Sequence, residues 1–342
     1  MSLKNLSVKI KIPKLLEYKL KNKRINQIYK KFEKSLNIKE NFVVAVSGGP
    51  DSLALAFLAK VYSIRNKLNS KFLIVDHKLR NESTHEAKTV KQILKKYSIN
   101  AEILTWKGKK PVKNIQSLAR KRRYELIFSK CDKFKIRNIL LGHHQDDLFE
   151  NFFIRMLRGS GLKGLISLDK KSKIDDRILL RPLLDQKKED LVFLSKNVFN
   201  FYVQDPTNED EKYQRIKIRK LIEELQKNGL DKKKFSKTLK NLKYSNEVVN
   251  YYTKENVKKN TFISSEKNQV FLNKSFFLQP YEVIFRSFSE IINLIGRKYY
   301  PARGKKLDKI ISDIQNYRLF RVTLGGCIIE KVNQTVVISK EY

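Results

Sequence analysis

The stretch Val43-Val44-Ala45-Val46-Ser47-Gly48-Gly49-Pro50-Asp51-Ser52-Leu53-Ala54-Leu55 decides the fold class. A β-branched run comes first, two glycines form a turn, and Pro50, Asp51 and Ser52 are typical of the first turn of a helix. A strand that passes through glycines into a helix presents unpaired backbone N–H groups to an anion, so the stretch predicts a phosphate-binding loop. Asp51 adds a carboxylate, expected either as a helix-start residue or as a ligand of a cation that is shared with the phosphate.

The same alternation of short strands and helices continues downstream. The expected strands are 42–46, 72–76, 101–105, 138–142 and 178–180, and the expected helices are 51–65, 84–97, 114–131, 145–157 and 187–198. This order predicts an α/β fold with a parallel sheet, whose ligands bind at the carboxyl ends of the strands. Three polar segments fall at that edge, namely 47–52, 76–77 and 143–147.

The rest of the chain divides by composition. We expect a basic N-terminal arm and helix over 1–40, a catalytic α/β domain over 41–210, a charge-rich helical connector over 211–261 and a small α+β domain over 262–342. The last of these ends in two β-type runs, 321–329 and 335–338, which are consistent with a hairpin.

The charge of the chain favours a polyanionic partner such as RNA. Lys and Arg total 73 against 35 Asp and Glu, a net charge of +38. A genome biased toward lysine would give the same excess on solvated surfaces, so both explanations stand. A hydrophobic fraction of 41% excludes a disordered chain.

The two cysteines argue against a metal-binding or redox-active cysteine site, and the apolar runs argue against a membrane-spanning protein. Cys131 and Cys327 match no metal or redox spacing and are expected to be reduced core residues. No apolar run reaches the roughly 18 residues that span a bilayer, so no membrane partner is expected. The cytoplasm is the expected compartment, and a mitochondrial transit peptide in the Lys-rich start is the alternative.

The glycine turn matches neither the Walker loop nor the dinucleotide fingerprint, because no Lys follows the glycines and the spacings differ. The string Ser47-Gly48-Gly49-x-Asp51-Ser52 instead resembles the pyrophosphate loop, or PP-loop, of the ATP pyrophosphatase superfamily. Those enzymes split ATP between its α and β phosphates. The resemblance implies an adenine nucleotide alpha hydrolase-like fold, ATP and Mg²⁺ as cofactors, and Asp51 as a ligand of the metal. It implies pyrophosphate binding by Ser47, Gly48, Gly49, Pro50, Asp51 and Ser52.

Six later motifs narrow the superfamily. They are 75–80 (VDHKLR), 119–124 (ARKRRY), 142–147 (GHHQDD), 158–165 (RGSGLKGL), 181–184 (RPLL) and 205–208 (DPTN). Together they resemble the tRNA(Ile)-lysidine synthetase family, and 300–303 and 323–326 extend the resemblance toward the C-terminus. The family implies ATP-dependent adenylation of the wobble cytidine in the CAU anticodon of tRNA(Ile), followed by attack of L-lysine. Whether the chain forms a homodimer is left open.

The resemblance and the helix spacing assign candidate site residues. The catalytic candidates are Asp51, His143, Asp146 and Asp147. The further nucleotide-binding candidates are Asp76, His77 and Arg120, although Asp76 and His77 could equally cap the following loop. The tRNA-binding candidates are Arg123, Arg155, Arg158, Arg215, Arg219 and Arg303. Asp146 and Glu150 share a helix face, where a carboxylate could bind the lysine ammonium or a metal. Zinc is not expected, because the His143-His144 pair has no cysteine nearby.

Two departures from the family pattern concern residues near this site. Leu148-Phe149-Glu150-Asn151 stands where the family has Gln-Ala-Glu-Thr, and Ile216 replaces an Asn between two arginines. The nearest alternative enzyme is a tRNA thiolase, which needs a reactive cysteine pair that this chain lacks. A non-catalytic RNA-binding protein is the other alternative, and it predicts loss of the loop residues or of the Asp146-Asp147 pair, all of which are present.

Overall fold

The chain forms two compact units, Met1–Leu230 (unit 1) and Asp231–Tyr342 (unit 2). The computed structural model describes residues 13–80, 82–108, 115–204, 212, 214–264, 268–298, 302–316, 318 and 321–341. The boundary falls inside 211–261, the predicted helical connector, so one helix of that segment belongs to each unit. The 205–208 motif, residues 1–12 of the basic N-terminal segment, and residues 300 and 301 lie outside the described residues.

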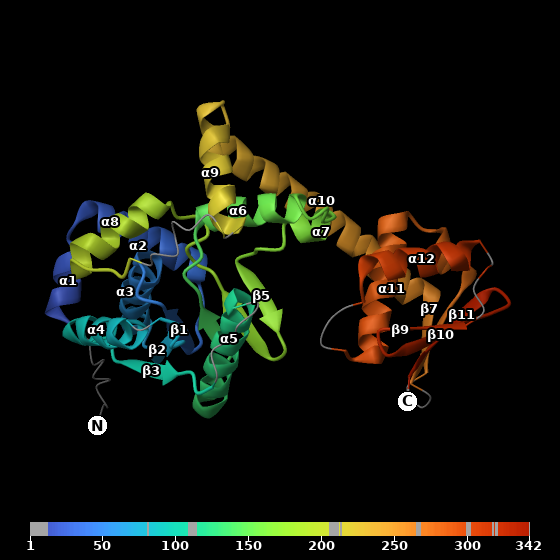
Figure 1. Ribbon diagram of the computed structural model, residues 1–342, viewed down its shortest axis with the longest axis horizontal. Coiled ribbons are helices and arrows are strands. Elements are labelled where there is room, and N and C mark those ends of the chain that lie inside the picture. Colours follow the sequence, from blue (N-terminus) through green and yellow to red (C-terminus); the bar gives the residue numbers. More distant parts are fainter. Residues whose placement is uncertain are drawn as a thin grey trace, which may run out of the picture. The chain divides into compact units, whose positions relative to one another are not determined.

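Unit 1 is a six-stranded sheet with helices on both faces (Figure 1). Its strands are β1 Phe42–Val46, β2 Ser70–Asp76, β3 Ala101–Thr105, β4 Asn138–Leu140, β5 Lys171–Ile174 and β6 Arg177–Leu180. Its helices are α1 Lys14–Leu20, α2 Lys23–Leu36, α3 Pro50–Arg65, α4 Ser83–Lys96, α5 Ile115–Phe134, α6 Gln145–Met156, α7 Leu162–Leu165, α8 Lys188–Phe199 and α9 Gln214–Lys227. The expected α/β architecture is therefore confirmed.

The strand order places the functional motifs together. The order is β3-β2-β1-β4-β6-β5, so the chain builds outward from β1 in one direction and then returns to β1's other side with β4. Both β2 and β4 pair with β1 in parallel. The reversal makes the carboxyl ends of β1 and β4 a topological switch point, which is where open α/β sheets bind ligands.

The central strands β1 and β2 bury side chains on both of their faces, because successive side chains point to opposite sides of the sheet. Val44 and Phe72 pack with helices α1 to α4 and α8, whereas Val43 and Leu73 pack with Cys131 of α5. Both cysteines are free and buried, as the sequence predicts. The continuous apolar runs of β1 and β2 follow from this two-sided cover.

Two details of the sheet correct the sequence-based prediction. The sheet is not wholly parallel, because the edge strand β5 pairs with β6 in antiparallel register. The fourth strand ends at Leu140 rather than at 142, since the chain turns there to pass the start of α3. A Cβ at Gly142 would lie 3.3 Å from the backbone carbonyl carbon of Asp51, so a glycine permits this close approach.

Unit 2 is an antiparallel sheet packed against helices (Figure 1). Its elements are α10 Lys232–Asn260, β7 Thr261–Ser264, β8 Gln269–Leu272, the 3₁₀ helix η2 Lys274–Leu278, α11 Tyr281–Gly296, α12 Gly304–Gln315, β9 Arg321–Leu324, β10 Cys327–Val332 and β11 Thr335–Lys340. The strand order is β7-β8-β11-β10-β9. The run 321–329 is two strands, because Gly325 and Gly326 both have positive φ and form a tight turn, so the predicted hairpin is part of a three-stranded meander.

Among the described residues, no helix is both long and apolar enough to span a bilayer.

Candidate active site

The PP-loop connects β1 to α3 and is shaped from within by Ser52. The Ser52 hydroxyl oxygen accepts the backbone N–H groups of Ser47 (3.1 Å) and Gly48 (3.0 Å), and the hydroxyl donates to the Gly49 carbonyl oxygen (3.0 Å). Ser47 Oγ lies 3.1 Å from Ser52 Oγ. Ser52 is buried, so in this structure it holds the turn closed, and the predicted Gly48 N–H donor is already occupied.

Two segments distant in sequence fix the loop from outside. Val203 N–H donates to the Gly48 carbonyl oxygen (3.0 Å), and Ser195 Oγ of α8 donates to the Pro50 carbonyl oxygen (2.6 Å). Gly48 has φ +90°, and a Cβ there would lie 2.7 Å from Val90 Cγ2. The loop therefore needs glycine at 48, both for its backbone conformation and for its packing.

His144 joins the PP-loop to α6. Its Nε2 lies 3.6 Å from Asp51 Oδ2 and 3.7 Å from Asp147 Oδ2. The Asp146 backbone N–H donates to His144 Nδ1 (3.2 Å), so a neutral His144 carries its proton on Nε2, facing both carboxylates. Asp147 Oδ2 in turn accepts the His144 backbone N–H (2.8 Å), which caps the helix reciprocally. The sequence suggested a role for His143 and missed His144, whose only sequence signal was its place before the acidic pair.

Asp51 has an oxygen available for a ligand. Its Oδ1 is buried and makes no hydrogen bond within the described part of the chain. Burial raises the pKa of Asp51, and the nearby Asp147 carboxylate adds to that rise against the opposing effect of His144. A buried carboxylate oxygen without a partner, next to a phosphate loop, is the environment that a bound cation would relieve.

The metal-binding prediction fits this oxygen. Among the described residues, no group of three or more His, Cys, Asp or Glu side chains is arranged to hold a metal by itself. Mg²⁺ at nucleotide sites takes one or two carboxylates and fills its other positions with phosphate oxygens and water. Asp51 therefore suits a Mg²⁺ that arrives with ATP.

The acidic face of α6 is held by two arginines of α9. The Arg215 guanidinium binds both Asp147 and Glu150, and Arg219 Nε donates to Glu150 Oε1 (2.6 Å). Glu150 is buried. Burial raises the pKa of Asp147, but the charges of His144, Arg215 and His143 outweigh this effect and hold that pKa below its usual range. Predicted as tRNA ligands, these arginines instead bind protein carboxylates here, and their contact with tRNA stays a prediction. Ile216 is buried.

Asp76 shapes the loop that follows β2. It accepts Ser83 Oγ (2.8 Å) and Lys78 N–H (3.0 Å) on one oxygen and Thr84 Oγ1 (2.7 Å) on the other. Of the two alternatives, loop capping is therefore the one that the structure shows for this carboxylate. The neighbouring His77 differs, because its Nε2 accepts from Arg123 Nε (3.3 Å) and its buried Nδ1 has no partner among the described residues.

His77 and His143 are both neutral near pH 7. Burial, reinforced by the Arg123 charge, lowers the pKa of His77 to about 4. Burial lowers the pKa of His143 to about 4 as well, against the opposing effect of Asp147. His143 Nδ1 is buried without a hydrogen-bond partner among the described residues. Because His77 Nε2 accepts from Arg123, a neutral His77 keeps Nδ1–H as a donor, and His143 can form a hydrogen bond through Nδ1; neither imidazole adds charge.

Arg181 is a site candidate to which the sequence gave no role. It is buried, its Nη1 donates to the Asp169 carbonyl oxygen (2.8 Å) and to Ser172 Oγ (3.0 Å), and its buried Nε has no partner among the described residues. Its charge and that of Arg120 both act on His143. These two arginines thus bring positive charge to the carboxyl end of β4.

Four arginines that the sequence predicts to bind nucleotide or tRNA, namely Arg120, Arg155, Arg158 and Arg303, are exposed or half-buried. Arg120 lies over the Tyr124 ring, 5.5 Å from its centroid, and Arg158 Nη2 donates to Gln214 Oε1 (3.0 Å). Arg155 lies in the last turn of α6, and Arg303 of unit 2 precedes α12. Their predicted roles with nucleotide or tRNA stay predictions.

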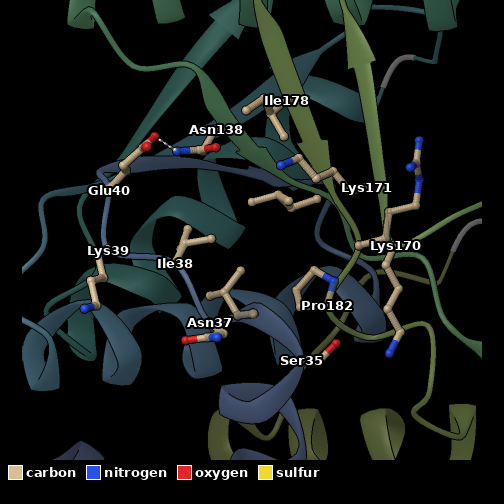
Figure 2. A pocket seen from close by; sticks show the side chains of 13 residues that line it. Ser35, Asn37, Ile38, Lys39, Glu40, Asn138, Lys170, Lys171, Ile178 and Pro182 are labelled. Atoms are coloured by element: carbon tan, nitrogen blue, oxygen red, sulfur yellow. Dashed lines mark hydrogen bonds between the residues drawn. The ribbon is translucent and has the colours of Figure 1, made fainter.

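A cavity of about 410 Å³ lies in unit 1 where the end of α2 and the segment after it meet β4, β5 and β6 (Figure 2). Glu40 and Asn138 close one side of it through a 2.7 Å hydrogen bond, and Lys171 and Ser35 line other parts. Arg181 also lines this cavity, whereas none of the site residues predicted from the sequence does. The reactive groups are at the switch point instead.

Comparisons with known proteins agree with this geometry. Residues 18–225 match the family model described as PP-loop domain. The tRNA(Ile)-lysidine synthase of Orientia tsutsugamushi (strain Boryong) is 36% identical over 312 residues, which are 87% of this chain and 69% of that protein. The tRNA(Ile)-lysidine synthase of Wolbachia sp. subsp. Brugia malayi (strain TRS) is 31% identical over 311 residues, covering 87% of this chain and 70% of that protein.

One solved structure shares the fold. The U34-tRNA thiolase NcsA from Methanococcus maripaludis, solved with its 4Fe-4S cluster, superposes with a TM-score of 0.53 at 17% identity. The match covers 64% of this chain and 79% of the thiolase. At this identity the likeness concerns the fold alone.

Proposed function

The chain belongs to the tRNA(Ile)-lysidine synthase family, which is built on the PP-loop domain, and from that premise we propose how unit 1 performs the reaction. The protein is a ligase that converts the wobble cytidine of the CAU anticodon of tRNA(Ile) to lysidine. ATP activates the base, L-lysine is joined to it, and AMP and pyrophosphate are released.

One observation carries the assignment of the site. The PP-loop after β1 and the 143–147 segment after β4 meet at the switch point, with His144 Nε2 3.6 Å from Asp51. A phosphate loop is thereby placed beside a carboxylate cluster and neutral imidazoles. This combination suits a reaction that binds triphosphate, releases pyrophosphate and admits an amine.

In the first step the carbonyl oxygen of the cytidine bonds to the α-phosphorus of ATP and pyrophosphate leaves. The open N–H groups of the first turn of α3 and its helix dipole attract the leaving pyrophosphate. Asp51 Oδ1 would hold the Mg²⁺, which when bound supplies positive charge to the phosphate oxygens. Neutral His143 and His77 offer hydrogen bonds to the nucleotide.

In the second step the ε-amine of L-lysine bonds to the activated carbon of the base, loses a proton, and AMP leaves with the carbonyl oxygen. Asp146 lies in the first turn of α6, beside the Asp147 carboxylate that the arginines fix in place. We assign Asp146 to the lysine ammonium, because it lies in the first turn of α6, next to Asp147 and at the carboxyl end of β4. The ion pairs of Asp147 and Glu150 with Arg215 hold α6, and α6 in turn positions Asp146.

The tRNA partner is assigned to the arginines at the surface. Arg155 lies in the last turn of α6, and Arg158 and the rest of the 158–165 turn follow that helix, so phosphate contacts there would orient the anticodon loop. The reaction belongs in the compartment that holds the tRNA pool, so the cytoplasm remains the proposed location. A homodimer is a further proposal that awaits measurement of the mass in solution.

The decisive experiment measures pyrophosphate release from ATP by the full chain with a tRNA(Ile) transcript that carries CAU, with and without L-lysine. We expect release with that tRNA, incorporation of labelled lysine only when both are present, and neither product with a transcript whose anticodon cytidine is replaced by uridine. Absence of lysine incorporation would refute the proposal. Release driven by another amine or sulfur donor would point to a different member of the PP-loop superfamily.

A further inference from the structure

Helix α10 of unit 2 exposes a face on which three tyrosines lie together with Val248, Glu255 and Lys259. Residues 244, 248, 251, 255 and 259 follow one another at three or four positions, as do 248, 252, 255 and 259, so all six share one side of the helix. That side carries Tyr244, Tyr251 and Tyr252, all exposed. The helix as a whole has nine lysines against two glutamates, a net charge of 9 − 2 = +7.

The tyrosines border an open groove. Tyr251 and Tyr252 are 61% and 54% exposed, and their rings meet edge to face with centroids 5.5 Å apart. The groove has a volume of about 360 Å³, and Glu255, Asn256, Lys259, Asn260 and Gln279 also line it. Lys259 Nζ lies 2.9 Å from Glu255 Oε2. Aromatic rings, amide groups and this ion pair thus surround a hollow that is large enough for a flat heterocycle.

The lysines and the exposed aromatic rings of α10 indicate whether the groove suits a protein or a nucleic acid. A protein partner would call for a surface depleted of lysine, because lysine is under-represented at protein interfaces. Lys240 instead lies 5.4 Å from the Tyr244 ring centroid, and Lys258 and Lys259 follow about two turns after Tyr252. Exposed aromatic rings set among cations are the platform on which single-stranded nucleic acids stack their bases.

We propose that the α10 tyrosine groove binds an unpaired nucleobase of RNA, stacked on Tyr251 or Tyr252, with the neighbouring lysines on the flanking phosphates. Amide groups such as those of Asn260 and Gln279 match the hydrogen-bonding edges of a base. The inference rests on the proposed function in that tRNA supplies the RNA. It adds a second recognition point, in unit 2, that reads an unstacked base.

The test uses the full chain, a tRNA(Ile) transcript with CAU, and a short single-stranded RNA that contains 2-aminopurine. A Tyr251→Ala/Tyr252→Ala double variant is compared with Tyr251→Phe/Tyr252→Phe, which keeps both rings. Tyr18→Ala is the matched control, because Tyr18 is 66% exposed on α1 of unit 1. Thermal unfolding checks that each variant is folded.

We expect the alanine pair to weaken binding of both RNAs by about tenfold, since stacking on an aromatic ring is worth that much or more per base. The phenylalanine pair and Tyr18→Ala should bind within about twofold of the wild type. The salt dependence of binding should be the same for all four proteins, because no lysine is removed. The 2-aminopurine fluorescence should be quenched by the wild type and the phenylalanine pair, and not by the alanine pair.

Three results would overturn the inference. They are unchanged affinity in a folded alanine pair, equal binding of a duplex and a single strand by the wild type, and no quenching of 2-aminopurine by the wild type. A change in oligomeric mass of the alanine pair with intact RNA binding would identify the groove as a protein interface instead. Lysidine formation by the wild type is assayed separately. If the wild type forms no lysidine, binding of the single-stranded RNA still tests the α10 tyrosine groove.

Discussion

His144 Nε2 lies 3.6 Å from Asp51 Oδ2, which links the first turn of α6 to the first turn of α3. The His144 ring is oriented by the Asp146 N–H that donates to its Nδ1. His144 is therefore a positioning residue that holds the PP-loop carboxylate against the α6 segment. Two substitutions separate this role from helix capping.

A His144→Asn variant keeps a side chain that caps the helix but is too short to reach Asp51. We expect a melting temperature close to that of the wild type and an adenylation rate lowered by about tenfold or more, because the loop carboxylate is less well positioned. His144→Ala should lose the same activity and in addition about 1 kcal/mol of stability through the lost cap. Single-turnover pyrophosphate release and thermal unfolding measure the two effects. Full activity in His144→Asn would contradict the positioning role.

The Asp51→Asn substitution should lower the adenylation activity and raise the stability of the fold. The raised pKa of Asp51 means that the folded protein binds this proton more tightly than the unfolded chain does. The ionised carboxylate therefore destabilises the fold at pH values above its folded pKa, and the effect disappears below the unfolded value of about 3.8. We expect a higher urea midpoint at pH 7 for the variant, no such gain below pH 3.8, and adenylation reduced by about 10²-fold. An active Asp51→Asn enzyme would exclude the metal-binding role.

Glu150→Gln should destabilise unit 1. The buried carboxylate is held by Arg215 and Arg219, and an amide leaves both guanidinium groups poorly paired. We expect a loss of about 2–4 kcal/mol, toward the lower end of the range for broken buried pairs because the arginines are partly exposed. The control is Arg155→Ala, at the end of the same helix, which should change stability by less than about 0.5 kcal/mol. Equal urea midpoints for the two variants would show that the α6–α9 pairing contributes nothing.

Gly48→Ala and Gly49→Ala should differ although the residues are adjacent. A methyl group at 48 would lie 2.7 Å from Val90 Cγ2 on a backbone with φ +90°, whereas at 49 its nearest neighbour is Ser47 Oγ at 3.8 Å. We expect Gly48→Ala to cost about 2–4 kcal/mol through overpacking and left-handed backbone strain, and Gly49→Ala to leave stability within about 1 kcal/mol. Chemical denaturation measures both. Equal losses would mean that the loop is held differently from the conformation described.

The acid sensitivity of the fold should depend on His143. Its folded pKa of about 4 lies below the ordinary value of 6.5, so the unfolded chain binds the proton more readily. Stability due to this residue is complete above pH 6.5 and is lost as the pH falls toward 4, by up to about 3 kcal/mol. Urea midpoints measured from pH 7 to pH 4 should fall less steeply for His143→Gln than for the wild type. Parallel slopes would show that His143 is not buried as a neutral imidazole.

Much of the fold was accessible from the sequence because its signals are local. The β-branched run before Ser47, the glycine turn and the apolar periodicity of 51–65 each specify structure over a few residues, and β1 and α3 follow within a residue or so. The antiparallel edge strand β5 was missed because 171–174 is polar and half exposed, so it lacks the apolar run of a central strand. The turn at Gly325-Gly326 was hidden within one continuous β-type run.

The sequence by itself determined the α/β class, the PP-loop and the order of motifs that defines the family, because each depends on neighbouring residues. Only the tertiary structure decided which groups pair. Glu150 meets Arg215 across 65 residues, and His144 meets Asp51 across 93 (144 − 51). Asp76 has both oxygens occupied by protein donors, while Asp51 Oδ1 has no hydrogen-bond partner within the described residues. Those outcomes depend on strand order and helix packing, which bring together residues whose separation in the chain carries no signal of their contact.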